Sequence, residues 1–239
     1  MQTIRKVSQR DVLFSEQMKL ADLIDLNYNL LPVISRLGVS VALSDFSVAA
    51  ACEKSGMDVP TLLLICNVYT FDDYVPSTGD LSKGNPRSII KYLHNSHLYY
   101  LDEALETLQG MLTRLLEPCN DNQKTIFWKF FNDYKAELQR HFGFEEDTVF
   151  PYVQSLIDGK AGADFSIEKF EDNHSNISEA LNDLKNIIMK YIPAECSDLL
   201  RSRVLMEVYG LEVDLAKHTR IEDNILVPIV TRIEENVRA

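Results

Sequence analysis

Apolar residues recur three and four positions apart over four long segments in the second two-thirds of the chain. This spacing places them on one face of an amphipathic helix. Glycine is sparse, and no segment shows the alternation with a period of two that is typical of a strand. Short connections with turn residues separate the segments, which are residues 87–117, 121–158, 166–191 and 194–237. The pattern predicts an all-α protein with an up-down-up-down four-helix bundle.

Shorter helical patterns precede the bundle. The sequence Asp-Val-Pro at residues 58–60 has the order of an N-cap followed by a proline in the first helical turn, and predicts a helix over residues 61–69. Ser44 and Asp45 are expected to open another helix through Cys52 in the same way. We therefore expect a small helical N-terminal domain.

A run of turn residues lies between the two parts of the chain. Residues 72–86 collect proline, glycine, serine and asparagine, which favour turns and linkers. The predicted organisation is a small helical domain, a linker and a bundle, at residues 1–75, 76–86 and 87–239.

One motif occurs twice in the predicted bundle. It consists of a histidine, a glutamate four residues later, an apolar run and a proline ten residues after the histidine. The copies are His141, Glu145 and Pro151, and then His218, Glu222 and Pro228, at an offset of 77 residues. The same offset separates His97 from His174. The predicted bundle is thus a duplicated helical hairpin, and a site on its pseudo-two-fold axis would receive equal ligands from each half.

These six residues have the chemistry of a metal site. A histidine and a glutamate four residues apart lie on one helix face, so both side chains can reach the same ion. Four imidazoles and two carboxylates exceed the needs of one four-coordinate zinc ion and suit two divalent ions, with the glutamates as bridges. Imidazole with carboxylate and without thiolate favours iron, with manganese or zinc as substitutes. The predicted metal ligands are His97, His141, Glu145, His174, His218 and Glu222.

Other polar residues near these ligands have two interpretations each. His94 precedes His97 by almost one turn but has no histidine at the 77-residue offset, so it is a neighbour of the site or a surface residue rather than a ligand. Glu137 lies one turn before His141 and is either a hydrogen-bond acceptor behind the ligands or a solvated charge. We assign the aromatic residues of the helical stripes, such as Phe130 and Phe150, to the core.

Composition limits the class of partner. The formal charge of −12 argues against nucleic acid and against anionic membrane surfaces, which need clustered lysine and arginine. No apolar run approaches the length of a membrane span, and no apolar signal core follows the N-terminus. The four cysteines are scattered without a CxxC motif, which indicates reduced thiols in the cytoplasm.

The approach to His97, the two HxxxE motifs with their prolines, and His174 resemble the hemerythrin-like (HHE) metal-binding domain. Together with the N-terminal helices, the set is most similar to the iron–sulfur cluster repair di-iron proteins. The resemblance implies an oxo-bridged non-haem di-iron centre in a four-helix bundle, with four terminal histidines and two bridging glutamates. It also implies that Glu137 lies close to that centre.

The sequence departs from this family at two places. The N-terminal module of the family often carries an adjacent cysteine pair, and the corresponding residues here are Ala42 and Leu43. The glutamate that commonly precedes the third histidine is Asn173. The first difference puts the thiol chemistry of the family in question for this chain, and the second lies close to the predicted metal ligands.

Two functions remain open at this point. The resemblance implies repair of iron–sulfur proteins damaged by oxidative or nitrosative stress, by iron donation or by redox handling of nitric oxide and oxygen species. The absence of the cysteine pair favours the alternative, a module that binds or senses O2 or NO without turnover. A purely structural metal site would not need this number of redox-capable ligands. The sequence leaves open whether the protein is an enzyme and whether it forms a homodimer.

Overall fold

The computed structural model describes residues 13–160, 165–167, 170 and 177–238. Over these residues the secondary structure is helical, without a strand, and the only bridge pairs Lys19 with Ser47. The expectation of an all-α protein is confirmed. The chain forms two compact units, one of residues 1–92 with 220–229 and the other of residues 93–219 with 230–239.

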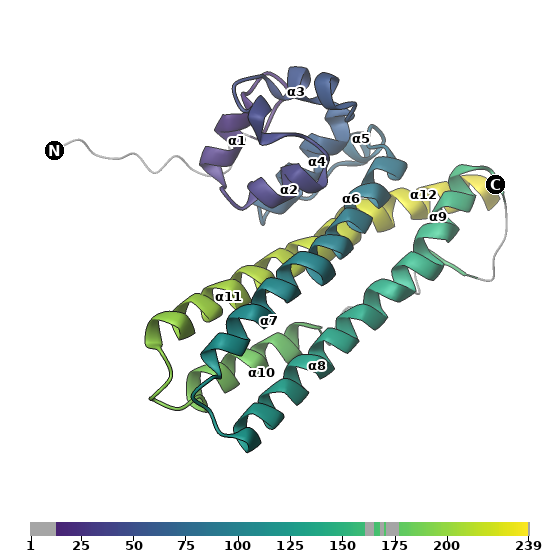
Figure 1. Ribbon diagram of the computed structural model, residues 1–239. Helices are drawn as coiled ribbons and strands as arrows, with labels where there is room; N and C mark the ends of the chain where they lie inside the picture. The colour runs from purple at the N-terminus through teal and green to yellow at the C-terminus, as the bar shows by residue number, and fades with distance from the viewer. Residues whose placement is uncertain (1–12, 161–164, 168–169, 171–176, 239) are drawn as a thin grey trace. The chain divides into compact units, whose positions relative to one another are not determined.

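The first unit contains the short N-terminal helices (Figure 1). They are α1 (Leu20–Leu26), α2 (Leu30–Arg36), the 3₁₀ turn η1 (Val41–Leu43), α3 (Val48–Ser55), α4 (Val59–Thr70) and α5 (Thr78–Leu81). Asp58 caps α4 by accepting a hydrogen bond from the backbone N–H of Thr61, as predicted. The expected cap of α3 is wrong, because Ser47 rather than Ser44 or Asp45 accepts the hydrogen bond from the first turn of that helix.

Helix α4 contributes several residues to the core of this unit, and Leu62, Ile65 and Cys66 are fully buried in it. Asn67 is buried as well, but its side chain is satisfied by the backbone of Phe14, whose N–H donates to Asn67 Oδ1 at 2.8 Å.

Arg220 also belongs to the first unit. Its guanidinium donates to the backbone oxygens of Phe71 and Tyr74 at 3.1 and 2.9 Å, and pairs with Asp72 at 3.2 Å. One side chain thus fixes the whole turn that follows α4.

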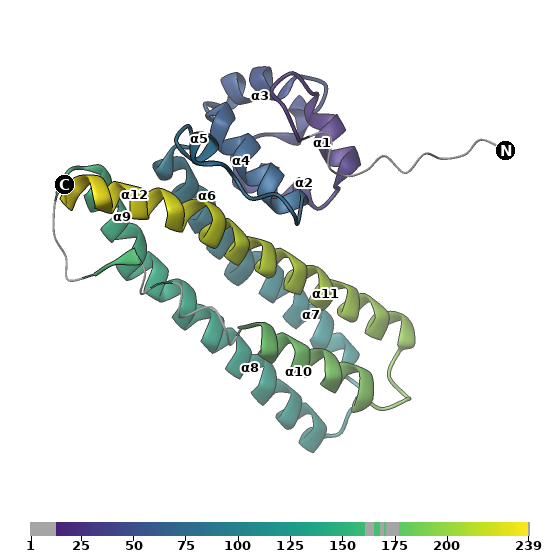
Figure 2. The same cartoon turned by 180° about the vertical axis from the view of Figure 1, so that it is seen from behind.

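Four long helical rods follow, and three of them are built from an α-helix, a π-helical turn and a second α-helix. The rods are α6 (Pro86–Leu98), η2 (Tyr99–Ala104) and α7 (Leu105–Leu115); α8 (Asp121–Phe144), η3 (Glu145–Val149) and α9 (Phe150–Ile157); α10 (Ile177–Lys190); and α11 (Asp198–Ile221), η6 (Glu222–Leu226) and α12 (Val227–Arg238). Within the second unit, α7, α8, α10 and α11 lie side by side in both views (Figures 1 and 2). The predicted four-helix bundle is confirmed.

Leucine, valine and phenylalanine at helical spacing form the core of the second unit. Helix α7 contributes Leu105, Leu108, Leu112 and Leu115, and α10 contributes Leu181, Leu184 and Ile188. The 77-residue offset is also present in this core, where residues of α8 and α11 are buried in pairs: Phe127 with Val204, Phe131 with Val208, Tyr134 with Leu211, and Leu138 with Leu215. The duplication therefore extends from the ligands to the packing.

The third rod begins later than predicted. A helix was expected from residue 166, but Phe165 and Ser166 are not helical, and the described helix of this rod is α10, Ile177–Lys190. The N–H of Ile167 donates to the carboxylate of Glu234 on α12 at 3.0 Å. This contact ties residues 165–167 to α12 through a side chain.

Across the described residues, we find no helix with the length and apolarity needed to cross a membrane.

Candidate metal centre

Five of the six predicted ligands lie among the described residues, where α-helices change into π-helical turns. His97 lies one residue before the end of α6, while His141 lies in the last turn of α8 and His218 in that of α11. Glu145 and Glu222 are the first residues of the π turns η3 and η6. π-helical turns within α-helices are frequent at functional sites, since the wider turn changes the direction of the side chains.

The repeated proline has a structural role in these turns. The N–H of Phe150 bonds to the carbonyl of Glu145, and the N–H of Val227 bonds to that of Glu222, each five residues back. Pro151 and Pro228 then occupy the second position of α9 and of α12. A proline ring clashes with the carbonyl one α-helical turn earlier, and the extra residue of a π turn relieves that clash. The helices therefore continue past both prolines.

Four predicted ligands form one buried cluster. Each of His97, Glu145, His218 and Glu222 offers one ligand atom, and these atoms lie within 4.8 Å of one another. The relative exposure is 3% for His97, 2% for His218 and 0% for both glutamates. Burying two carboxylates is costly unless a cation or hydrogen bonds compensate their charge.

Glu145 has the surroundings of a bridging carboxylate. Its Oε2 lies 2.9 Å from Nε2 of His97, and its Oε1 lies 2.8 Å from Nε2 of His141. Despite these short distances, no described group donates a hydrogen bond of acceptable geometry to either oxygen. The two imidazole nitrogens therefore lie close to the carboxylate oxygens without the geometry of a hydrogen bond. This donor set fits a cation shared by the carboxylate and the imidazoles.

A second carboxylate stands behind His97. Oε1 of Glu146 lies 2.6 Å from Nδ1 of His97, and both oxygens of Glu146 lie 3.0 Å from Nδ1 of His94. Burial raises the pKa of Glu146, but the hydrogen bonds to His97 and His94 and their charges lower it more, so the net pKa is below its usual value. A carboxylate on Nδ1 fixes the tautomer of the ring and leaves Nε2 as the metal-binding atom.

This arrangement settles the position of His94. Its side chain is 48% exposed and contacts Glu146 rather than the buried cluster. It lies outside the buried cluster, beside the carboxylate that contacts His97.

Aromatic rings surround the histidines. Phe142 and Phe150 stack on the ring of His97, with centroid distances of 4.1 and 5.5 Å. Tyr100 meets the ring of His218 edge-on at 5.6 Å, and its hydroxyl donates to the backbone carbonyl of Asp214 at 3.3 Å. The rings keep water away from the cluster and hold the imidazole planes in place.

The remaining predictions for the site have different outcomes. His141 lies beside Glu145 with a side chain 9% exposed. His174 and Asn173 lie outside the described residues. Glu137 is half-buried, and its charge affects the hydroxyl of Tyr134. Burial raises the pKa of this hydroxyl, and the negative charge of Glu137 raises the same pKa further.

Sequence reasoning missed the role of Glu146. Its only signal was the position directly after the first predicted bridging glutamate, where the second copy of the motif has Asp223. The π turn that directs adjacent carboxylates to the two nitrogens of one imidazole leaves no trace in the hydrophobic pattern.

Comparison with known proteins gives a family for this chain. The family model of the hemerythrin HHE cation-binding domain matches residues 88–230, which is more than half of the 239 residues. A comparison with curated proteins gives no match. The matched region includes both HxxxE motifs, His97 and Glu146. The chain therefore belongs to the hemerythrin HHE cation-binding domain family.

Proposed function

We propose that this cation-binding protein holds two iron ions and acts in the repair of iron–sulfur clusters under oxidative or nitrosative stress. The observation that carries the proposal is the fully buried Glu145 carboxylate with an imidazole Nε2 within 2.9 Å of each oxygen. One carboxylate between two imidazoles is the donor set expected of a bridge between two metal ions.

In this proposal the terminal ligands are His97, His141, His174 and His218, and the bridges are Glu145 and Glu222. Manganese or zinc would replace iron where the medium lacks it. Bound iron would supply one-electron redox chemistry and an affinity for dioxygen and nitric oxide.

The protein's own contribution is orientation and exclusion of water. Glu146 holds His97 through Nδ1, so that this imidazole does not need to reorient when a cation arrives. Phe142 and Phe150 cover the ring of His97 and limit access to small uncharged molecules. Such a site favours diatomic ligands over larger anions.

We further propose that the protein works in the cytoplasm on damaged iron–sulfur proteins. The net charge of −12 disfavours nucleic acid and anionic membranes as partners, and the four cysteines are free thiols.

Metal content tests the di-iron premise. The full chain, produced in iron-supplied cells and purified without chelator, is expected to contain about two iron ions per chain, as expected for a two-metal site, with antiferromagnetic coupling in Mössbauer spectra. A content of one ion or fewer, or uncoupled iron, would contradict the assignment.

The repair function needs a separate assay. An iron–sulfur enzyme inactivated by peroxide or nitric oxide is incubated with the iron-loaded chain, and recovery of its activity is measured. The control is the Glu145→Gln variant, which keeps the shape of the side chain and loses its charge. Recovery with the native chain alone supports repair, and equal recovery with both proteins contradicts it.

One observation favours a second function, the binding or sensing of O2 or NO without turnover. Ala42 lies in the 3₁₀ turn η1 and Leu43 ends it, where the repair proteins that the chain resembles often carry a cysteine pair. Reversible optical changes with nitric oxide, together with no recovery of the damaged enzyme, would favour this alternative.

A further inference from the structure

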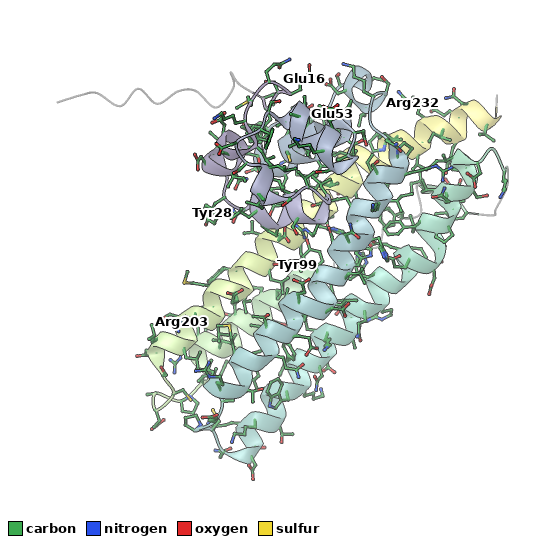
Figure 3. All side chains as sticks on the ribbon, turned by 45° about the horizontal axis from the view of Figure 1, so that its top comes forward. Glu16, Tyr28, Glu53, Tyr99, Arg203 and Arg232 are labelled. Atoms are coloured by element: carbon green, nitrogen blue, oxygen red, sulfur yellow. The ribbon has the colours of Figure 1, made fainter. Side chains whose placement is uncertain are left out.

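Two free cysteines meet at the end of the second unit where the hairpin loops lie. Cys119 lies in the α7–α8 connection and Cys196 in the α10–α11 connection, and their Sγ atoms are 3.7 Å apart. Both loops lie at the end of the bundle opposite α9 (Figures 1 and 2). Arg203, labelled in Figure 3, lies near the start of α11 at this end.

The two cysteines occupy equivalent positions in the duplicated hairpins. They are 77 residues apart, the offset that relates the candidate ligands. Each ends a turn closed by the same type of backbone bond, from Cys119 N to Leu116 O at 2.9 Å and from Cys196 N to Pro193 O at 3.1 Å. The pseudo-two-fold relationship therefore brings one thiol from each hairpin to the same point.

We propose that Cys119 and Cys196 form a reversible disulfide that joins the two hairpin loops under peroxide stress. The inference is independent of the proposed iron chemistry, because neither cysteine belongs to the metal cluster. A disulfide needs an S–S distance of about 2.05 Å, and rotation of side chains in the two turns can close the gap from 3.7 Å. Residues in turns can make this adjustment without breaking a helix.

One thiol has a route to solvent. Cys119 is 5% exposed and lines a cavity of about 500 Å³ with apolar neighbours that include Phe127, Ile187 and Tyr191. A small uncharged oxidant such as hydrogen peroxide fits this cavity. Cys196 is 2% exposed and does not line the cavity. Cys119 is therefore the first thiol to react, and Cys196 is the resolving thiol.

The reaction balances with hydrogen peroxide as the oxidant. The Cys119 thiolate attacks one peroxide oxygen, the O–O bond breaks, and a sulfenic acid and water form after proton transfer. The Cys196 thiolate then attacks Sγ of Cys119, the S–O bond breaks, and a second water leaves. In sum, two thiols lose two electrons and two protons, and one peroxide becomes two water molecules. A dithiol reductant reverses the change by exchange.

The environment makes this reaction slow in unstressed conditions. Burial raises the pKa of Cys119 to about 11, with further contributions from its hydrogen bond to Cys196 and the charge of that thiol, while Lys124 and Arg201 act in the opposite direction. Because only the thiolate attacks peroxide, the pair remains reduced until the oxidant is abundant.

Peptide mapping of the full chain tests the proposal. After treatment with millimolar hydrogen peroxide and alkylation of free thiols, digestion without reductant is expected to yield one linked peptide pair joining Cys119 and Cys196. Dithiothreitol should restore both free thiols. No linked pair, or oxidation of Cys119 to sulfinic acid without a link, would overturn the proposal.

Thermal unfolding gives a second readout. A link across 77 residues should raise Tm by about 5 to 10 °C, because it restricts the unfolded chain. The Cys119→Ser and Cys196→Ser variants should lose this increase, and Cys52→Ser should keep it, since Cys52 lies in α3 of the first unit. An equal increase in Tm in all three variants would refute a disulfide between Cys119 and Cys196. If a variant does not fold, peptide mapping of the native chain remains the decisive test.

Discussion

Oε1 of Glu146 lies 2.6 Å from Nδ1 of His97, while the preceding residue, Glu145, approaches Nε2 of the same ring. Two consecutive residues therefore engage both nitrogens of one imidazole. Glu145 is positioned to share a cation with His97. Glu146 fixes the tautomer of His97 that leaves Nε2 free to bind that cation.

Replacement of Glu146 by glutamine should weaken metal retention without removing a candidate ligand. An amide orients His97 less strongly than a carboxylate, and loss of such a partner typically costs about 10- to 100-fold in metal affinity. Competition with a chelator measures the effect. Asp147→Asn is the matched control, because it removes one charge from an exposed neighbour in the same π turn. Equal weakening in both variants would mean that net charge, not orientation, controls affinity.

Replacement of Glu145 by glutamine should have a larger effect, of more than about 100-fold, because it removes the candidate bridge itself. In the native chain, removal of the metal by chelation should lower Tm, since a ligand that binds only the folded state stabilises it. The variant should unfold at the same temperature with and without chelator. A chelator-dependent Tm in Glu145→Gln as large as that of the native chain would exclude this residue as a bridge.

Arg220 is expected to stabilise the turn after α4. Replacement by alanine removes hydrogen bonds to the backbone of Phe71 and Tyr74 and the ion pair with Asp72, and should cost about 2 kcal/mol in unfolding free energy. Replacement by lysine should recover little, because one ammonium cannot reproduce the planar fork. Arg203→Ala, at an exposed position of α11, should change stability by less than about 0.5 kcal/mol. Urea unfolding compares the three variants, and a neutral Arg220→Ala would disprove the role.

The ion pair between Lys185 and Glu212 lies inside the bundle, where Lys185 occupies the repeat position of the core residue Leu108. The ammonium lies 2.6 Å from Oε1 of Glu212, with side-chain exposures of 9% and 28%. Glu212→Gln should cost about 2 to 3 kcal/mol, because it leaves a buried charge uncompensated. Lys185→Met should cost less, because the Glu212 carboxylate that it leaves unpaired is 28% exposed and can be hydrated, and an apolar chain of similar length suits this position.

A second ion pair of the same length provides the control for that prediction. Lys135 and Glu106 are also 2.6 Å apart, but their side chains are 24% and 53% exposed. Glu106→Gln should cost less than about 1 kcal/mol. Thermal unfolding measures the loss of stability in Glu212→Gln and in Glu106→Gln. Equal losses would contradict the prediction that burial makes the first ion pair the more costly one to break.

Glu234 anchors residues 166–167 to α12. Its carboxylate accepts hydrogen bonds from the Tyr152 hydroxyl at 2.6 Å and from the Ile167 N–H at 3.0 Å. Tyr152→Phe should cost about 1 to 2 kcal/mol, and Glu234→Ala more, because the alanine also leaves the Ile167 donor unsatisfied. Hydrogen exchange at Ile167 measures the second effect directly. Unchanged exchange in Glu234→Ala would contradict the anchoring role.

The hydrophobic pattern was sufficient to predict the helical rods and most of their boundaries. The period of apolar residues located the second rod, from Asp121 to Ile157, within a residue at each end, and Asp58 with Pro60 located the start of α4 within two residues. The histidines and glutamates were predicted as a set because they repeat at one offset. The structure brings His97, His141, Glu145 and His218 to one place in the second unit.

Tertiary contacts explain what the pattern could not predict. The helix expected from residue 166 is absent at Phe165 and Ser166, and the neighbouring Ile167 N–H instead bonds to Glu234, a residue far along the chain. Nothing in the sequence marks Lys185 as buried, and its ammonium is compensated there by Glu212 and by the ring of Tyr209. The cysteine pair was overlooked because two residues in loops carry no periodic signal.

The π turns have a further consequence for the register of the helices. Each one adds a residue to a helical turn, and one residue corresponds to about 100° of rotation about the helix axis. Deletion of Asp147 would convert η3 into an ordinary α turn and rotate α9 by that angle relative to α8. Val149 and Val153, now buried, would then lose alignment with Leu138 and Phe142. The π turn thus determines which face of α9 is buried, independently of which face of α8 is buried.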